Sequence, residues 1–145
     1  MSAIIGVGLD GSDVITDWFS INLQLCQWTF AFAANHLLLK HVIDTISTKF
    51  NASTSAQIAA NTVHTVTGPT IFTASILEYL RKRGYTNIDA LRFRNEPIQL
   101  DDILILPVTS FSPENEGMGG NGTNGTYSFV RHLFLGSWHQ AVTNL

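Results

Sequence analysis

The chain has 145 residues, of which 45% are hydrophobic and 13% charged, and its formal net charge is −3. This length and apolar content are typical of one folded domain with a substantial core, and they exclude a disordered chain. Eight scattered basic residues form no positive patch, so we expect no nucleic-acid partner. The single cysteine, Cys26, excludes an intrachain disulfide and a thiolate zinc site, and its apolar neighbours predict a buried thiol.

Neither a signal peptide nor a membrane span is visible in the composition. The first ten residues lack a basic region and a long apolar run. The most apolar window, residues 23–39, is interrupted by four polar side chains, whereas a bilayer span needs about 20 predominantly apolar residues. We therefore expect a single domain over residues 1–145 that contains no membrane-spanning helix.

Four segments have the pattern of strands. Residues 3–9 form an apolar run before a turn of sequence DGSD, and residues 102–108 form a second continuous apolar run typical of a covered sheet. Residues 88–93 predict a further strand. In residues 26–33, alternation of large and small side chains predicts a strand with one aromatic face, made by Trp28, Phe30 and Phe32.

Two segments have the pattern of helices. Asn35 is a suitable N-cap for a helix that ends near Asn51, and its apolar stripe contains Leu39, Val42, Ile43, Ile46 and Phe50. The second helix begins at Pro69, ends at Gly84 after three basic residues, and has a stripe of Phe72, Ile76, Leu77 and Leu80. Residues 109–127 are rich in Gly and Asn and predict a loop. This mixture of strands and helices under a loop-rich end predicts an α/β or α+β fold.

Acidic pairs offer the first candidates for chemistry. Asp10 and Asp13 lie in a turn where two carboxylates could hold a divalent metal, but turn aspartates more often bond their own backbone. Asp101 and Asp102 precede a strand and predict a solvated turn. The phosphate-binding and nucleophile-elbow motifs are absent from the sequence. Spacing alone therefore leads no further than a mixed α/β domain.

The last bulky stretch, FVRHLFLGSWHQ at residues 129–140, is unusual so close to a chain end. A Trp preceded by Gly and Ser predicts a segment that folds back over another surface. His132 and His139 are seven residues apart, which matches no zinc signature, so a structural histidine is the default interpretation. Three glycosylation sequons, at Asn51, Asn121 and Asn124, favour a secretory compartment weakly.

Four strings carry a resemblance to a known family: CQWTFAFAANHLLLKHVID, TGPTIFTASILEYL, LPVTSFSP and FVRHLFLGSWHQ. In this order and at these separations they resemble glycosyltransferase family 32, and within it the fungal initiation-specific α-1,6-mannosyltransferases of the Golgi. The resemblance extends from about Ile4 to Trp138. It implies an α/β fold of the GT-A type (Rossmann-like), of which this chain would be the C-terminal half, with a mixed sheet and flanking helices.

The resemblance also implies a function. Members of the family are retaining glycosyltransferases that use a divalent metal, usually Mn²⁺. This chain would then use GDP-mannose as donor and an N-glycan as acceptor. By similarity, the late Gly-Ser-Trp segment covers the donor diphosphate. Gly136 and Trp138 are therefore candidate donor-binding residues, Ser137 is a candidate metal ligand, and His132 is a nearby supporting metal-site group. The chain would act in the Golgi.

Departures from the family pattern matter as much. The family's Asp-x-Asp motif supplies the main ligands of the metal. No aspartates of this chain match it in spacing or in position along the sequence. The prolines that flank the family's histidine are missing around His36. We therefore expect a truncated copy that is inactive alone and self-associates through an exposed sheet edge near residues 4–7 and 103–106. The alternative is a non-catalytic carbohydrate-binding or partner protein built from the same half-fold.

Overall fold

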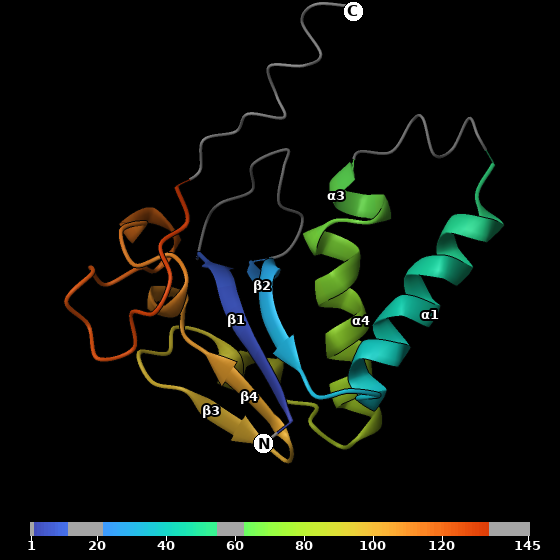
Figure 1. The fold of residues 1–145 in the computed structure, drawn as a ribbon, viewed down its shortest axis with the longest axis horizontal. Helices are drawn as coiled ribbons and strands as arrows, with labels where there is room; N and C mark the ends of the chain where they lie inside the picture. Colours follow the sequence, from blue (N-terminus) through green and yellow to red (C-terminus); the bar gives the residue numbers. More distant parts are fainter. Residues whose placement is uncertain (1, 12–21, 55–62, 134–145) are drawn as a thin grey trace, which may run out of the picture.

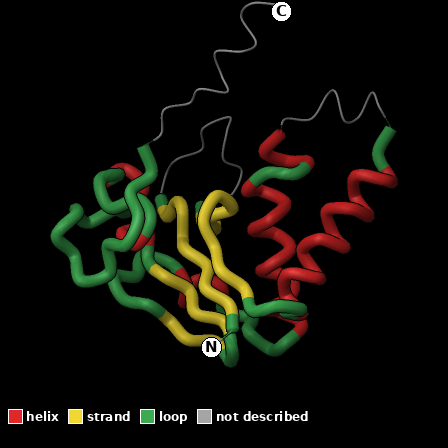
Figure 2. Tube along the Cα trace, in the orientation of Figure 1, coloured by secondary structure: helices red, strands yellow, loops and turns green. Residues whose placement is uncertain are grey.

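The computed structural model describes residues 2–11, 22–54 and 63–133. Within this part of the chain one mixed sheet forms in the order β2-β1-β4-β3 (Figures 1 and 2). Its strands are β1 (Ala3–Asp10), β2 (Leu23–Phe32), β3 (Ile98–Leu100) and β4 (Ile103–Leu106). β1 pairs antiparallel with β2 and parallel with β4, while β3 pairs antiparallel with β4. The predicted α/β fold with a mixed sheet is confirmed.

Among the described residues, three α-helices lie on one side of this sheet (Figure 1): α1 (Leu37–Ala52), α3 (Val63–Val66) and α4 (Pro69–Lys82). α4 follows its sequence pattern closely. Pro69 occupies the first turn, where a missing N–H has no cost, and Arg81 and Lys82 occupy the last turn. Gly84 follows the helix with a φ of 91°, a left-handed conformation that favours glycine.

The main core lies between the helices and the sheet. Its fully buried members come from every layer: Ile5 from β1, Leu25 from β2, Leu38 from α1, Ile76 from α4 and Ile105 from β4. Burial of one such side chain contributes about 1.5–3 kcal/mol, so this cluster is the principal source of stability. The predicted stripe of α4 is confirmed, because each of its four residues is buried.

The other side of the sheet is covered by residues 107–133, which we call the loop layer (Figure 1). It contains two short 3-10 helices, η2 (Val108–Ser110) and η3 (Glu116–Met118). Phe111 forms a second, smaller apolar cluster with Cys26 and Leu106. The ring of Phe111 lies so close to β1 that a Cβ on Gly6 would be 2.1 Å from a ring carbon. The glycine therefore makes room for the loop layer.

Cys26 is buried and free, as expected from its neighbours, and burial raises the pKa of its thiol. The predicted single aromatic face of β2 is wrong. Between the pairs Ile5–Phe30 and Val7–Leu25, a two-residue step on β1 is matched by a five-residue step on β2. This bulge breaks strict alternation. Phe30 stacks on Phe72 of α4, whereas Trp28 contacts His132 of the loop layer.

The predicted strand at residues 88–93 is also wrong. Residues Ile88–Leu91 form a 3-10 helix, η1, which the Arg92 backbone N–H closes by donating to the Asp89 carbonyl. Side-chain contacts of Arg92 then hold this segment at the end of β1, so it joins no sheet. The actual edge strand is the three-residue β3, which the pattern did not predict.

The prediction of an exposed sheet edge near residues 4–7 and 103–106 is wrong. These residues belong to β1 and β4, which pair with each other at the centre of the sheet. The edge strands of the described sheet are β2 and β3. A search of the described helices finds none with the length and apolarity to cross a bilayer.

The N-cap of α1 is His36 and not Asn35, which instead takes a left-handed φ of 61°. His36 Nδ1 accepts a hydrogen bond from the Leu38 N–H at 3.1 Å, and its Nε2 lies 3.1 Å from Asp102 Oδ2. Desolvation opposes ionisation of Asp102, but the hydrogen bond from Ser2 and the nearby cationic groups outweigh it and lower the pKa of Asp102. His36 thus ties α1 to the β3–β4 turn.

We expect His36→Ala to lower the free energy of unfolding by about 1–2 kcal/mol, because it removes a helix cap and a hydrogen bond to a carboxylate. Chemical denaturation of the purified chain measures this. Lys40→Ala is the control, since Lys40 forms only an exposed i,i+4 pair with Asp44 and should change stability by less than about 0.5 kcal/mol. Equal losses in the two variants would contradict a structural role for His36.

Gly6→Ala should destabilise the chain by about 1–3 kcal/mol, because the new methyl group overlaps the Phe111 ring. Gly117→Ala is the matched control, since the nearest atom to its Cβ lies 3.8 Å away on Asn115. The double variant Gly6→Ala/Phe111→Ala should lose less stability than the sum of its parts. Strict additivity in denaturation experiments would argue against this contact.

Candidate functional site

The carboxyl ends of β1 and β4 meet at one edge of the sheet, where ligands of open α/β folds commonly bind. Asp10 ends β1 and is buried, with its Oδ1 3.1 Å from Arg92 Nε. Its second carboxylate oxygen accepts from the Phe93 backbone N–H. Both carboxylate oxygens of Asp10 therefore accept hydrogen bonds from other parts of the fold. The structure supports a structural role for Asp10 over a role as a metal ligand.

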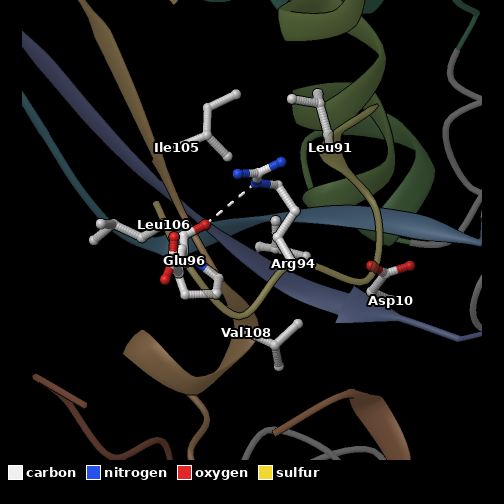
Figure 3. A pocket seen from close by; sticks show the side chains of 9 residues that line it. Asp10, Leu91, Arg94, Glu96, Ile105, Leu106 and Val108 are labelled. Carbon is white, nitrogen blue, oxygen red and sulfur yellow. Dashed lines mark hydrogen bonds between the residues drawn. The ribbon is translucent and has the colours of Figure 1, made fainter. Parts of the chain in front are cut away.

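Figure 3 shows the hollow beside Asp10, between the ends of β1 and β4 and residues 91–96. Its volume is about 10 Å³, which admits no more than one water molecule. Arg94 on its wall donates from Nε to the Glu96 carbonyl at 3.2 Å. This hollow is too small for a sugar or a nucleotide.

The last described part of the loop layer returns along η2. The backbone N–H groups of Phe129 and Val130 both donate to the Ser110 carbonyl at 3.0 Å, and that of His132 donates to the Phe111 carbonyl at 3.2 Å. Since Phe111 is packed on Gly6, these bonds fix residues 129–132 relative to the sheet. The stretch that leads to the Gly-Ser-Trp segment is thus anchored.

A larger hollow, of about 250 Å³, lies in the loop layer and is lined by Ser112, Glu114, Asn115, Arg131, His132 and Leu133. We call it the loop-layer hollow. An ion pair at 2.6 Å joins Arg131 Nη2 to Glu114 Oε2 on its wall. The alternation of a strand predicts Arg131 on the opposite side from His132, but both residues line the same hollow, because residues 129–132 form no strand. Sequence reasoning assigned no role to Ser112, Glu114 or Asn115, although the string LPVTSFSP already contained the first.

Of the four site residues that the family resemblance implies, His132 is the one that the structure describes. Its ring lies 4.9 Å from the Trp28 ring, centroid to centroid, and is tilted by 54°. Burial lowers the pKa of His132 below its usual 6.5. The imidazole therefore stays neutral at physiological pH and can both donate and accept hydrogen bonds.

The other predicted site residues, Gly136, Ser137 and Trp138, lie outside the described residues, as do His139 and Asp13. Among residues 2–11, 22–54 and 63–133, side chains of His, Cys, Asp and Glu nowhere gather in a group of three that could hold a metal ion. Near His132 the acidic group, Glu114, is already paired with Arg131. The described residues do not fit a Mn²⁺ site, so no step through a metal follows from them.

The chain is similar in sequence to three fungal proteins. The chain is 33% identical over 139 residues to the initiation-specific alpha-1,6-mannosyltransferase of Schizosaccharomyces pombe, covering 91% of the chain and 35% of that protein. The protein of the same name in Candida albicans is 31% identical over 144 residues, covering 84% of the chain and 37% of that protein. A shorter match, 36% over 69 residues, exists to the Saccharomyces cerevisiae protein of this name.

The resemblance to fungal mannosyltransferases is therefore confirmed, and the chain is a homologue of these proteins. It spans about a third of the length of the two relatives that it matches over most of its own residues. No family model and no solved structure matches the chain.

The lowered pKa of His132 yields a testable pH dependence. Trp28→Ala should uncover the imidazole and raise its pKa towards 6.5, measured by NMR titration of the ring protons. Phe30→Ala is the control, because Phe30 is an exposed aromatic residue of the same strand that packs on α4 and should leave the titration unchanged. Equal titration curves in all three proteins would rule out shielding by Trp28.

The sign of the stability effect follows from the same shift. Because the pKa is lower in the folded state, the unfolded chain binds a proton first, and the contribution of His132 is present above about pH 6.5. It is lost as the pH falls through the folded-state pKa.

Proposed function

We propose that this chain forms part of a mannosyltransferase of the family 32 type, which transfers mannose from GDP-mannose to an N-glycan acceptor in the Golgi. The observation that carries the proposal is the similarity to named α-1,6-mannosyltransferases over 91% and 84% of the chain. The three sequon asparagines, Asn51, Asn121 and Asn124, are exposed, which is compatible with a luminal location.

The geometry supports a site in the loop layer. Residues 129–132 are anchored by backbone hydrogen bonds, and Arg131 and His132 line a polar hollow of about 250 Å³. Gly136, Ser137 and Trp138 follow four to six residues after His132 in the sequence. In this proposal Gly136 and Trp138 contact the donor, and Trp138 keeps water away from the diphosphate. Ser137 would supply one oxygen to a divalent metal, with His132 as a nearby supporting group.

The experiment joins the chain to the remaining upstream segment of the Schizosaccharomyces pombe relative and measures mannose transfer from GDP-mannose. We expect the isolated chain to be inactive, since its sequence lacks the family's Asp-x-Asp carboxylates, and the chimera to be active. An inactive chimera that folds as well as the active parent protein would contradict the proposal and favour the non-catalytic carbohydrate-binding protein.

Within the chimera, Trp138→Ala should lower transfer relative to hydrolysis of GDP-mannose, because an open site admits water. The ratio of transferred to free mannose measures this directly. Lys40→Ala, on the exposed surface of α1, is the control and should leave the ratio unchanged. If Trp138 only stabilises the fold, both reactions will fall together with the amount of folded protein. Arg131→Ala is unsuitable as a control, since Arg131 lines the hollow.

A further inference from the structure

We propose that Asn124 in the loop layer is a site of spontaneous deamidation, and that the fold protects its neighbour Asn121 from the same reaction. These residues begin the two Asn-Gly dipeptides of the sequence, and each dipeptide is followed by Thr. Both asparagines are exposed. Local sequence and exposure therefore do not separate the two positions, and the difference between them comes from backbone hydrogen bonds.

The reaction needs only water as a co-reactant. The backbone nitrogen of Gly125 loses its proton and bonds to Cγ of Asn124, and Nδ2 leaves with one added proton as ammonia. Water then opens the resulting cyclic imide at either carbonyl, which yields an aspartate or an isoaspartate. Glycine after asparagine favours this attack, because glycine has no Cβ to hinder the approach of its nitrogen.

The backbone at Asn121 is held by hydrogen bonds at two successive nitrogens. The Asn121 N–H donates to Thr109 Oγ1 at 3.0 Å, and the Gly122 N–H donates to the Pro113 carbonyl at 2.7 Å. Thr109 and Pro113 are buried, so both bonds tie the dipeptide to the inner part of the loop layer. Attack by the Gly122 nitrogen requires its bond to Pro113 to break and the backbone to rotate into the reactive geometry.

The corresponding nitrogens of Asn124 and Gly125 are not held in this way. Neither N–H group donates a hydrogen bond to any other described residue. The Gly125 carbonyl accepts from the Ser128 N–H at 3.1 Å, but this bond leaves the Gly125 nitrogen available. Asn124 and Gly125 can therefore reach the reactive geometry without breaking a hydrogen bond at the attacking atom.

Deamidation would change the chemistry of this part of the loop layer. Nδ2 of Asn124 is also the atom to which a glycan at this sequon would be attached, so its loss as ammonia destroys the sequon. The product carries an additional negative charge on a chain whose formal net charge is already −3. Because the reaction consumes only water, its outcome does not depend on whether the chain transfers mannose.

The test follows deamidation of the purified 145-residue chain in mildly alkaline buffer, with a sample unfolded in denaturant beside it. Peptide fragmentation in a mass spectrometer assigns each lost amide to residue 121 or 124. In the folded chain Asn124 should react at least about fivefold faster than Asn121, the factor that one hydrogen bond supplies. In the unfolded chain the two rates should be similar. Equal rates in the folded chain, or the same ratio in both samples, would overturn protection by the fold.

Thr109→Val provides a second measurement, because it removes the hydroxyl that accepts from the Asn121 N–H and keeps nearly the same shape. We expect faster deamidation at Asn121 and an unchanged rate at Asn124. A folded variant with an unchanged rate at Asn121 would contradict the role of this hydrogen bond. Circular dichroism shows whether the variant is folded, and if it is not, the comparison of the two wild-type samples still decides.

Discussion

The arrangement of the loop layer depends on one contact, the Phe111 ring lying against Gly6. Without a Cβ on Gly6 the ring reaches the backbone of β1, and any side chain there would displace it. The carbonyls of Ser110 and Phe111 then accept hydrogen bonds from the backbone N–H groups of Phe129, Val130 and His132. The position of His132, and with it the wall of the loop-layer hollow, follows from that ladder. The position of the candidate site therefore depends on the absence of a side chain at Gly6, in the central strand β1.

The two faces of the sheet are stabilised unequally among the described residues. The helical side buries a large cluster from β1, β2, β4 and two long helices, and β3 packs against it with partly buried side chains. Among the described residues, the buried apolar core of the loop side consists of Cys26, Leu106 and Phe111. Segments with few buried apolar contacts open at low free energy, and binding segments are commonly drawn from them. Because of the bulge in β2, side chains of this strand pack on both faces of the sheet: Phe30 contacts α4, and Trp28 contacts the loop layer.

Elements with strong periodicity were predictable from sequence. The central strands and α4 combine apolar runs with clear end signals, and both were found as expected. Local patterns failed where a distant partner decides the structure. Residues 88–93 became η1 because Arg92 bonds to Asp10, 82 residues away, and the cap of α1 moved to His36 because Asp102 holds its ring. The hollow was likewise hidden, since its walls come from two stretches that only the backbone ladder brings together.

Charge separates what the described residues can do from what a nucleotide-sugar enzyme also needs. Arg131, on the wall of the loop-layer hollow, is paired with Glu114 at 2.6 Å. Arg94, on the wall of the smaller hollow, instead donates to the backbone carbonyls of Glu96 and Ala90. A leaving diphosphate develops negative charge that requires uncommitted cations, a metal or backbone N–H groups. Because Arg131 and Glu114 are committed to each other, the loop-layer hollow offers an anion no uncommitted cationic side chain among the described residues.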